Sequence, residues 1–128
     1  MNLPNFHDGF LDGFLIADNK SVRLFLKTEN GSRYTVVLHG VEALKIWDVR
    51  QGNIIFDVSL VGSDQLTESN LHEVYDISHA DDANMQLNAL LGRARHAQMQ
   101  FVELTASYGA QCAALFRSGE IEENYRWS

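Results

Sequence analysis

The chain has 128 residues, a hydrophobic content of 45% and a formal net charge of −7. This length suits one domain, residues 1–128, that buries roughly 65–70% of its unfolded surface, and no linker-like run divides it. The acidity argues against nucleic acid or an anionic membrane as the main partner, because both are bound through clustered lysine and arginine. No apolar run approaches a membrane span and the N-terminus does not resemble a signal peptide, so we expect a cytoplasmic protein.

The first part of the chain reads as short antiparallel strands. Apolar residues alternate over 22–28 and 33–38, which is the period of a half-buried strand, and over 10–16, where Phe10, Phe14 and Ile16 alternate around Asp12. Asp18-Asn19-Lys20 supplies a turn between the first two strands. Asn30-Gly31 predicts a two-residue primed turn between the next two, because both residues tolerate positive φ.

A fourth strand is expected within 41–49, although the first half of that segment would also suit a helical turn. A fifth is expected over 54–61, with its alternate residues from Ile54 to Leu60 facing inward. The predicted core therefore joins residues of three strands. Its members are Leu24, Leu26, Val36, Leu38, Phe56 and Val58.

The middle of the chain favours helices. Ser63 or Asp64 is the candidate cap of a short helix that reaches Tyr75, and Asp81-Asp82 is the candidate start of a second helix that ends near Gly92 or His96. Arginines in the last turn of the second helix would complement its dipole.

Strands return at the end of the chain. Residues 99–105 predict a strand with apolar residues on both faces, and 110–117 predict a strand or an alanine-rich helix, of which the tight turn before it favours the strand. Residues 121–127 suit an edge strand. The sequence thus predicts a β-rich α+β fold, an antiparallel meander that forms a curved sheet or sandwich with one or two peripheral helices.

The candidate catalytic residues are His7, Asp8 and Asp12. A histidine beside a carboxylate can bind a metal or move protons near neutral pH. Neighbouring residues on a strand point to opposite faces, so His7 and Asp8 converge only if the chain turns there. We favour a structural role for the pair, through a turn or cap hydrogen bond. We expect no bound metal and no cofactor, because the other histidines lack ligand spacing.

The lone cysteine, Cys112, rules out a disulfide framework within the chain, and we expect it to be a buried, inert thiol.

The C-terminal tail is the candidate partner-binding segment. Tyr125 and Trp127 offer aromatic contacts, while Glu122 and Glu123 would restrict unwanted strand pairing and favour a basic partner. We expect either a homodimer or a protein partner that engages this tail or a neighbouring edge.

Three short motifs carry a resemblance. They are Phe6-His7-Asp8-Gly9, the segment Gly52–Val58 and Ser107-Tyr108-Gly109-Ala110. Together they look like a group of small uncharacterised bacterial proteins, some of which resemble immunity proteins of polymorphic toxin systems. The resemblance implies a β-rich single domain without known catalytic residues.

Two functions follow as hypotheses. The first is a non-enzymatic protein-binding domain, in particular an immunity-type inhibitor of a toxin. The alternative is a small metal-dependent or acid/base hydrolase that uses His7, Asp8 and Asp12. A pocket that brings those three side chains within ligand distance would favour the hydrolase, and a shallow surface with exposed aromatic and acidic residues would favour the binding domain.

Overall fold

The computed structural model describes residues 1–76 and 83–123. Within them the chain forms eight strands, two α-helices and one 3-10 helix, η1 (Ser63–Gln65). The helices are α1 (Glu68–Tyr75) and α2 (Ala83–His96). The strands are β1 (Phe10–Ile16), β2 (Val22–Lys27), β3 (Arg33–His39), β4 (Ala43–Trp47), β5 (Asn53–Val61), β6 (Gln100–Tyr108), β7 (Gln111–Phe116) and β8 (Ser118–Glu123). The predicted β-rich α+β fold is confirmed.

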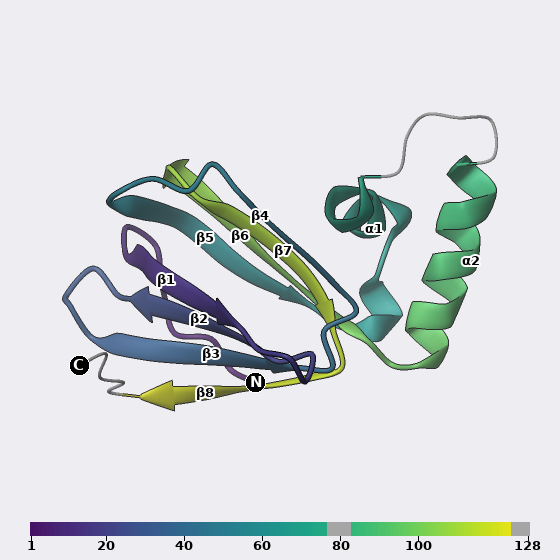
Figure 1. Ribbon diagram of the computed structural model, residues 1–128, viewed down its shortest axis with the longest axis horizontal. Coiled ribbons are helices and arrows are strands. Elements are labelled where there is room, and N and C mark those ends of the chain that lie inside the picture. Colours follow the sequence, from purple (N-terminus) through teal and green to yellow (C-terminus); the bar gives the residue numbers. More distant parts are fainter. Residues whose placement is uncertain (77–82, 124–128) are drawn as a thin grey trace.

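All eight strands belong to one antiparallel sheet with the order β4-β7-β6-β5-β1-β2-β3-β8. Strands β1 to β3 form one meander and β5 to β7 another. The remaining two strands cross over, since β4 pairs with β7 and β8 pairs with β3. The two meanders meet where Phe10 and Leu11 pair with β5. The sheet bends at this junction, so that the meanders lie over one another (Figure 1).

The main core fills the space between the two meanders. Its buried side chains come from β1, β2 and β3 on one side and from β5, β6 and β7 on the other. Four of the six predicted core residues belong to it, namely Leu24, Leu26, Val36 and Leu38, and the half-buried Val58 packs against it. Cys112 is also a buried member, as predicted.

A second core lies between the helices and the outer face of β6 and β7. Leu71 and Val74 of α1 and Leu91 of α2 pack there with Phe101 and Leu115 of the sheet. This explains why 99–105 is apolar on both faces: Val102 and Leu104 enter the main core, whereas Phe101 enters the second. The helices stand at one end of the sheet in Figure 1.

The cap of α1 differs from the prediction. Ser63 and Asp64 lie in η1, and Thr67 caps α1 instead. The Thr67 hydroxyl accepts from the Asn70 amide at 3.3 Å, and the Asn70 side chain accepts from the Thr67 amide at 2.9 Å. This reciprocal capping box satisfies two amides that the first turn leaves unpaired. The predicted start of the second helix at Asp81-Asp82 lies outside the described residues.

The hairpin between β2 and β3 is confirmed, but its turn is of another type. The Thr28 amide donates to the Ser32 carbonyl at 2.9 Å and the Gly31 amide donates to the Thr28 carbonyl at 2.9 Å. The loop between Thr28 and Ser32 therefore has three residues, 29–31. Of these three, only Gly31 has a positive φ, +93°. This is a type I turn with a glycine bulge, not a two-residue primed turn. Side-chain bonds of Thr28 and Asn30 within the loop accompany this arrangement.

Phe56 is the main error in the predicted core. Ile55 pairs with Ala106 and Asp57 with Thr105, so Phe56 is an extra residue that bulges out of the β5–β6 ladder. The bulge reverses the expected alternation, because Ile55 is fully buried while 56% of Phe56 is exposed. The aromatic ring that we expected in the core thus lies on the surface.

Candidate functional site

The chain turns at His7 and Asp8, which is the condition for their two side chains to approach each other. Asp8 has a φ of +61°, and the Gly9 amide donates to the Phe6 carbonyl at 2.8 Å, which closes the turn. The Asp8 amide donates to the Ile55 carbonyl at 3.0 Å and attaches the turn to β5. As a result His7 Nε2 lies 3.5 Å from Asp8 Oδ2.

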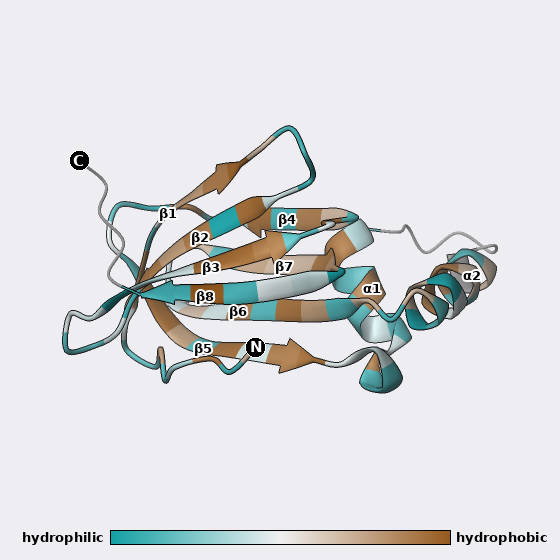
Figure 2. Cartoon of the chain, turned by 90° about the horizontal axis from the view of Figure 1, so that it is seen from below, coloured by the Kyte–Doolittle hydropathy of each residue, from teal (hydrophilic) through white to brown (hydrophobic). Residues whose placement is uncertain are grey.

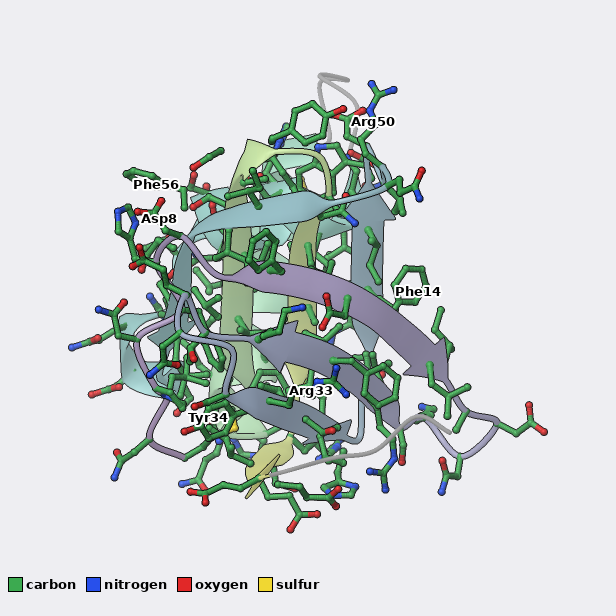
Figure 3. The ribbon with its side chains drawn as sticks, turned by 90° about the vertical axis from the view of Figure 1, so that its left-hand side faces the viewer. Asp8, Phe14, Arg33, Tyr34, Arg50 and Phe56 are labelled. Atoms are coloured by element: carbon green, nitrogen blue, oxygen red, sulfur yellow. The ribbon has the colours of Figure 1, made fainter. Side chains whose placement is uncertain are left out.

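Phe56 completes this cluster. His7 Nδ1 donates to the Phe56 carbonyl oxygen at 2.7 Å, and the two rings meet edge to face with 5.5 Å between centroids. Figure 3 shows Asp8 and Phe56 side by side at one corner of the molecule. The Phe56 carbonyl, followed by the Asp8 carboxylate, raises the pKa of His7 above its ordinary value, because both stabilise the imidazolium.

Asp12 does not join the cluster. Leu11 and Gly13 oppose consecutive residues of β2, so Asp12 is the extra residue of a bulge in β1. Its carboxylate lies 3.7 Å from Lys27 Nζ. Among the described residues, no group of three or more His, Cys, Asp and Glu side chains is arranged to hold a metal ion. The three candidate catalytic residues therefore divide into one pair and one separate carboxylate.

The surface beside His7 is an open polar groove of about 560 Å³. Its lining residues are Asn5, His7, Thr28, Glu29, Asn30, Ser32 and Tyr34. About half of the His7 side chain is exposed, so water is not excluded from the imidazole. Both ring nitrogens of His7 are already engaged within the chain, one by the Phe56 carbonyl and one by Asp8. This corner binds a proton more readily than an ordinary histidine, with Nδ1 hydrogen-bonded to the Phe56 carbonyl and Nε2 beside the half-exposed Asp8 carboxylate.

An edge strand near the C-terminus, β8, begins at Ser118, three residues before the predicted strand of 121–127, whose last four residues lie outside the described chain. This edge is well protected. Its register with β3 places Glu120 opposite Val37 and Glu122 opposite Thr35. Glu122 Oε2 lies 3.2 Å from Arg23 and Glu120 Oε1 lies 3.0 Å from His39. Glu122 and Glu123 are both exposed. Tyr125 and Trp127 lie outside the described residues, so their contribution to partner binding stays a prediction.

Strand β4, at the other end of the sheet, is also protected. It is short, and Lys45 stands at its centre. Lys45 Nζ lies 2.6 Å from Asp76 Oδ1 at the end of α1, and it also lies over the Trp47 ring, 4.8 Å from the centroid. Helix α1 itself packs against β4. Short length, a lysine and a covering helix are three ways in which proteins prevent pairing at an edge.

The second half of β1 is short as well and follows the bulge at Asp12, but it contains no lysine. Within the described chain, β1 pairs with β5 only at Phe10 and Leu11, whereas its pairing with β2 continues to Ile16. From Gly13 to Ile16 there is no charge and no proline. The three side chains at its end are exposed: Phe14 by 38%, Leu15 by 52% and Ile16 by 60%. Figure 2 shows this hydrophobic end of β1 standing apart from the body of the sheet, and Phe14 projects outward in Figure 3.

Asn53 marks the point where β1 separates from β5. Its buried side-chain oxygen accepts from the Arg50 amide at 2.8 Å and from the Ala110 amide at 2.9 Å, and its nitrogen donates to the Leu11 carbonyl at 3.4 Å. Of these three bonds only the last reaches β1, and the other two join the side chain to the loops that precede β5 and β7. Beyond Leu11, β1 pairs with no strand of the described chain other than β2.

Sequence reasoning did not assign a functional role to Phe14, Leu15 and Ile16. Strand alternation places Phe10, Phe14 and Ile16 on one face, but the bulge at Asp12 puts Phe10 on the opposite face from the other two. A run of three large apolar residues at the end of a strand was the available signal, because strict alternation would have put a polar residue at position 15.

Comparison with protein-family models, with curated proteins and with solved structures finds no match to this chain. The resemblance to bacterial immunity proteins therefore remains an expectation. Of the helices described, neither is long and apolar enough to cross a membrane.

Proposed function

We propose that this chain is a non-enzymatic protein-binding domain whose partner adds an extended segment to the free edge of β1. The observation that supports this most is the pairing of β1, which extends to Ile16 on the side of β2 but stops at Leu11 on the side of β5. An open strand edge offers main-chain hydrogen bonds to another chain, and exposed apolar residues on it mark an interaction site.

The partner in this proposal is basic. The net charge of −7 favours a positively charged partner and speeds its approach. Strand β8 also carries negatively charged side chains that would attract a basic partner. Two of its carboxylates already lie beside Arg23 and His39. An immunity-type inhibitor that covers a basic toxin in the cytoplasm is the particular form of this function that the resemblance implies.

The test uses short linear peptides selected from a random display library for binding to the full chain. We expect the selected peptides to shift the NMR amide signals of residues 12–16 and to bind more weakly as salt is added. Leu15→Lys should abolish binding. Val49→Lys is the matched control, since Val49 is 53% exposed and Leu15 is 52% exposed, and the control adds the same charge.

Two outcomes would contradict the proposal. One is a set of peptides that shift the signals of β8 and bind the Leu15→Lys variant as well as the wild type. The other concerns self-association, which light scattering measures. If the wild type is a dimer at micromolar concentration and Leu15→Lys is a monomer, the edge is occupied by a second copy and not by a foreign partner.

The hydrolase alternative is supported by the 3.5 Å approach of His7 and Asp8 and by the open groove that His7 lines. It is the weaker candidate, because Asp12 is paired with Lys27 and both imidazole nitrogens have partners within the chain.

A further inference from the structure

A small apolar pocket lies where the end of β1 meets the beginning of β4. Its volume is about 240 Å³, and its walls include Ile16 and Ala17 on one side and Val41 and Leu44 on the other. Val22 also lines the pocket and is a buried member of the main core, against which Val41 and Leu44 pack. The pocket is therefore an opening of the main core to the surface.

Two contacts hold the walls of this pocket together. The Val41 amide donates to the Lys20 carbonyl at 2.9 Å, and Lys20 Nζ lies 3.6 Å from Glu42 Oε1. Both contacts join the β1–β2 hairpin to the segment that begins β4. The pocket is thus formed before any partner arrives, which lowers the ordering cost of binding.

The free edge of β1 leads to this pocket. Ile16 pairs with Val22 and Phe14 with Leu24, so Phe14 and Ile16 are on the face of the sheet that points to the main core. A strand added along the free edge would lie about 4.8 Å from β1. Its side chains opposite Phe14 and Ile16 would share their face, because directly opposed residues of neighbouring strands point the same way.

We infer that the segment added to β1 inserts one apolar side chain, of leucine or phenylalanine size, into the pocket beside Ile16. The partner is then an extended segment of a basic protein with apolar side chains at alternate positions. This inference rests on the proposed function and adds the source of its specificity. Main-chain hydrogen bonds to β1 would hold the segment, and the pocket would select one of its side chains by size and polarity.

An extended segment fits this surface better than a folded second copy. A stable interface between folded proteins takes about 800 Å² and roughly 20–30 residues from each partner. The apolar surface at the end of β1 consists of three partly exposed side chains. A second copy also carries the same net charge of −7, which opposes its approach, whereas a basic segment is attracted.

The experiment compares pairs of peptides on the full-length chain. Peptides selected on the wild type should carry an apolar anchor residue, and replacing that anchor by alanine should weaken binding roughly 10- to 100-fold, as expected for burial of one large apolar side chain. The variant Ala17→Leu fills the pocket. In it, the difference between the anchored and the alanine peptide should fall below about threefold. Val41→Ala enlarges the pocket and should shift the preference toward a larger anchor, and circular dichroism checks that both variants fold.

The outcomes separate this inference from the proposed function. One outcome is that the peptides bind at β1 and do not bind the Leu15→Lys variant, while Ala17→Leu and Val41→Ala leave the preference for the anchor residue unchanged. In that case the edge of β1 is the binding site, but the pocket does not select the side chain. If binding does not depend on Leu15, the proposed function is wrong and the pocket inference is wrong with it.

Discussion

Gly109 offers a sharp test of the junction that separates β1 from β5. It has a φ of +88°, and a Cβ added there would collide with the side-chain oxygen of Asn53 and stand 3.2 Å from its Cγ. Gly109→Ala therefore adds two costs, backbone strain and a collision with a buried side chain that holds three segments. Gly52→Ala is the matched control, because Gly52 has a φ of +80° with no atom within 4 Å of the added Cβ.

The magnitudes follow from these contacts. Placing alanine at positive φ costs roughly 1–2 kcal/mol, and this cost applies to both variants. In Gly109→Ala the Asn53 side chain must also move, and this movement would break its hydrogen bonds to the amides of Arg50 and Ala110. Loss of two such bonds with partly buried partners costs roughly 2–4 kcal/mol. We expect Gly109→Ala to lose roughly 2–4 kcal/mol more of the free energy of unfolding than Gly52→Ala.

Urea denaturation followed by tryptophan fluorescence measures both free energies of unfolding. Asn53→Ala should lose a similar amount by removing the same bonds directly, and Gly109→Ala in the Asn53→Ala background should cost little more than Gly52→Ala. Equal losses for Gly109→Ala and Gly52→Ala would refute the role given to Asn53.

The remaining predictions concern single side chains. Phe56→Ala should cost less than about 1 kcal/mol because its ring is exposed, whereas Phe101→Ala should cost roughly 3–5 kcal/mol in the same urea assay; similar losses would place Phe56 in a core. Burial raises the pKa of Cys112 to about 12, so a thiol reagent should leave the folded chain unmodified at mildly alkaline pH and react once per chain in urea; rapid reaction of the folded chain would contradict its burial. NMR should find the pKa of His7 above 6.5, and Asp8→Asn should lower it. Since the folded-state pKa of His7 is raised, its protonation stabilises the fold fully below the unfolded pKa, and this contribution disappears as pH rises through the folded pKa; a normal pKa in the folded chain would contradict the contacts described.

Local sequence signals predicted most of the sheet. Alternation and turn residues placed β2, β3, β6 and β7 because these depend on neighbours in the sequence. The hairpin turn was wrong in type, since Asn-Gly also suits the last two positions of a three-residue loop. The cap at Thr67 had a local signal that was missed: threonine three residues before asparagine can form the reciprocal bonds of a capping box.

Two features of the candidate binding surfaces, the bulge at Phe56 and the exposed end of β1, depend on contacts between residues far apart in the sequence. The bulge at Phe56 lies where the Asp8 turn bonds to the carbonyl of Ile55, and nothing near residue 56 in the sequence reveals that contact. In the same way, the exposure of Phe14 and Ile16 accompanies the end of the β1–β5 pairing at Leu11, and β5 is distant from β1 in the sequence. Strand periodicity shows which residues share a face, but it does not show whether another layer covers that face.

Hydrogen–deuterium exchange on the full chain, with and without a selected peptide, tests the free edge of β1 most directly. We expect the peptide to add protection to the amides of Phe14 and Ile16, which the alternation of the β1–β2 ladder turns away from β2. We expect no added protection across residues 118–123 of β8, the edge that carries three glutamates. Added protection confined to β8, or none within β1, would contradict the claim that the end of β1 is the binding edge.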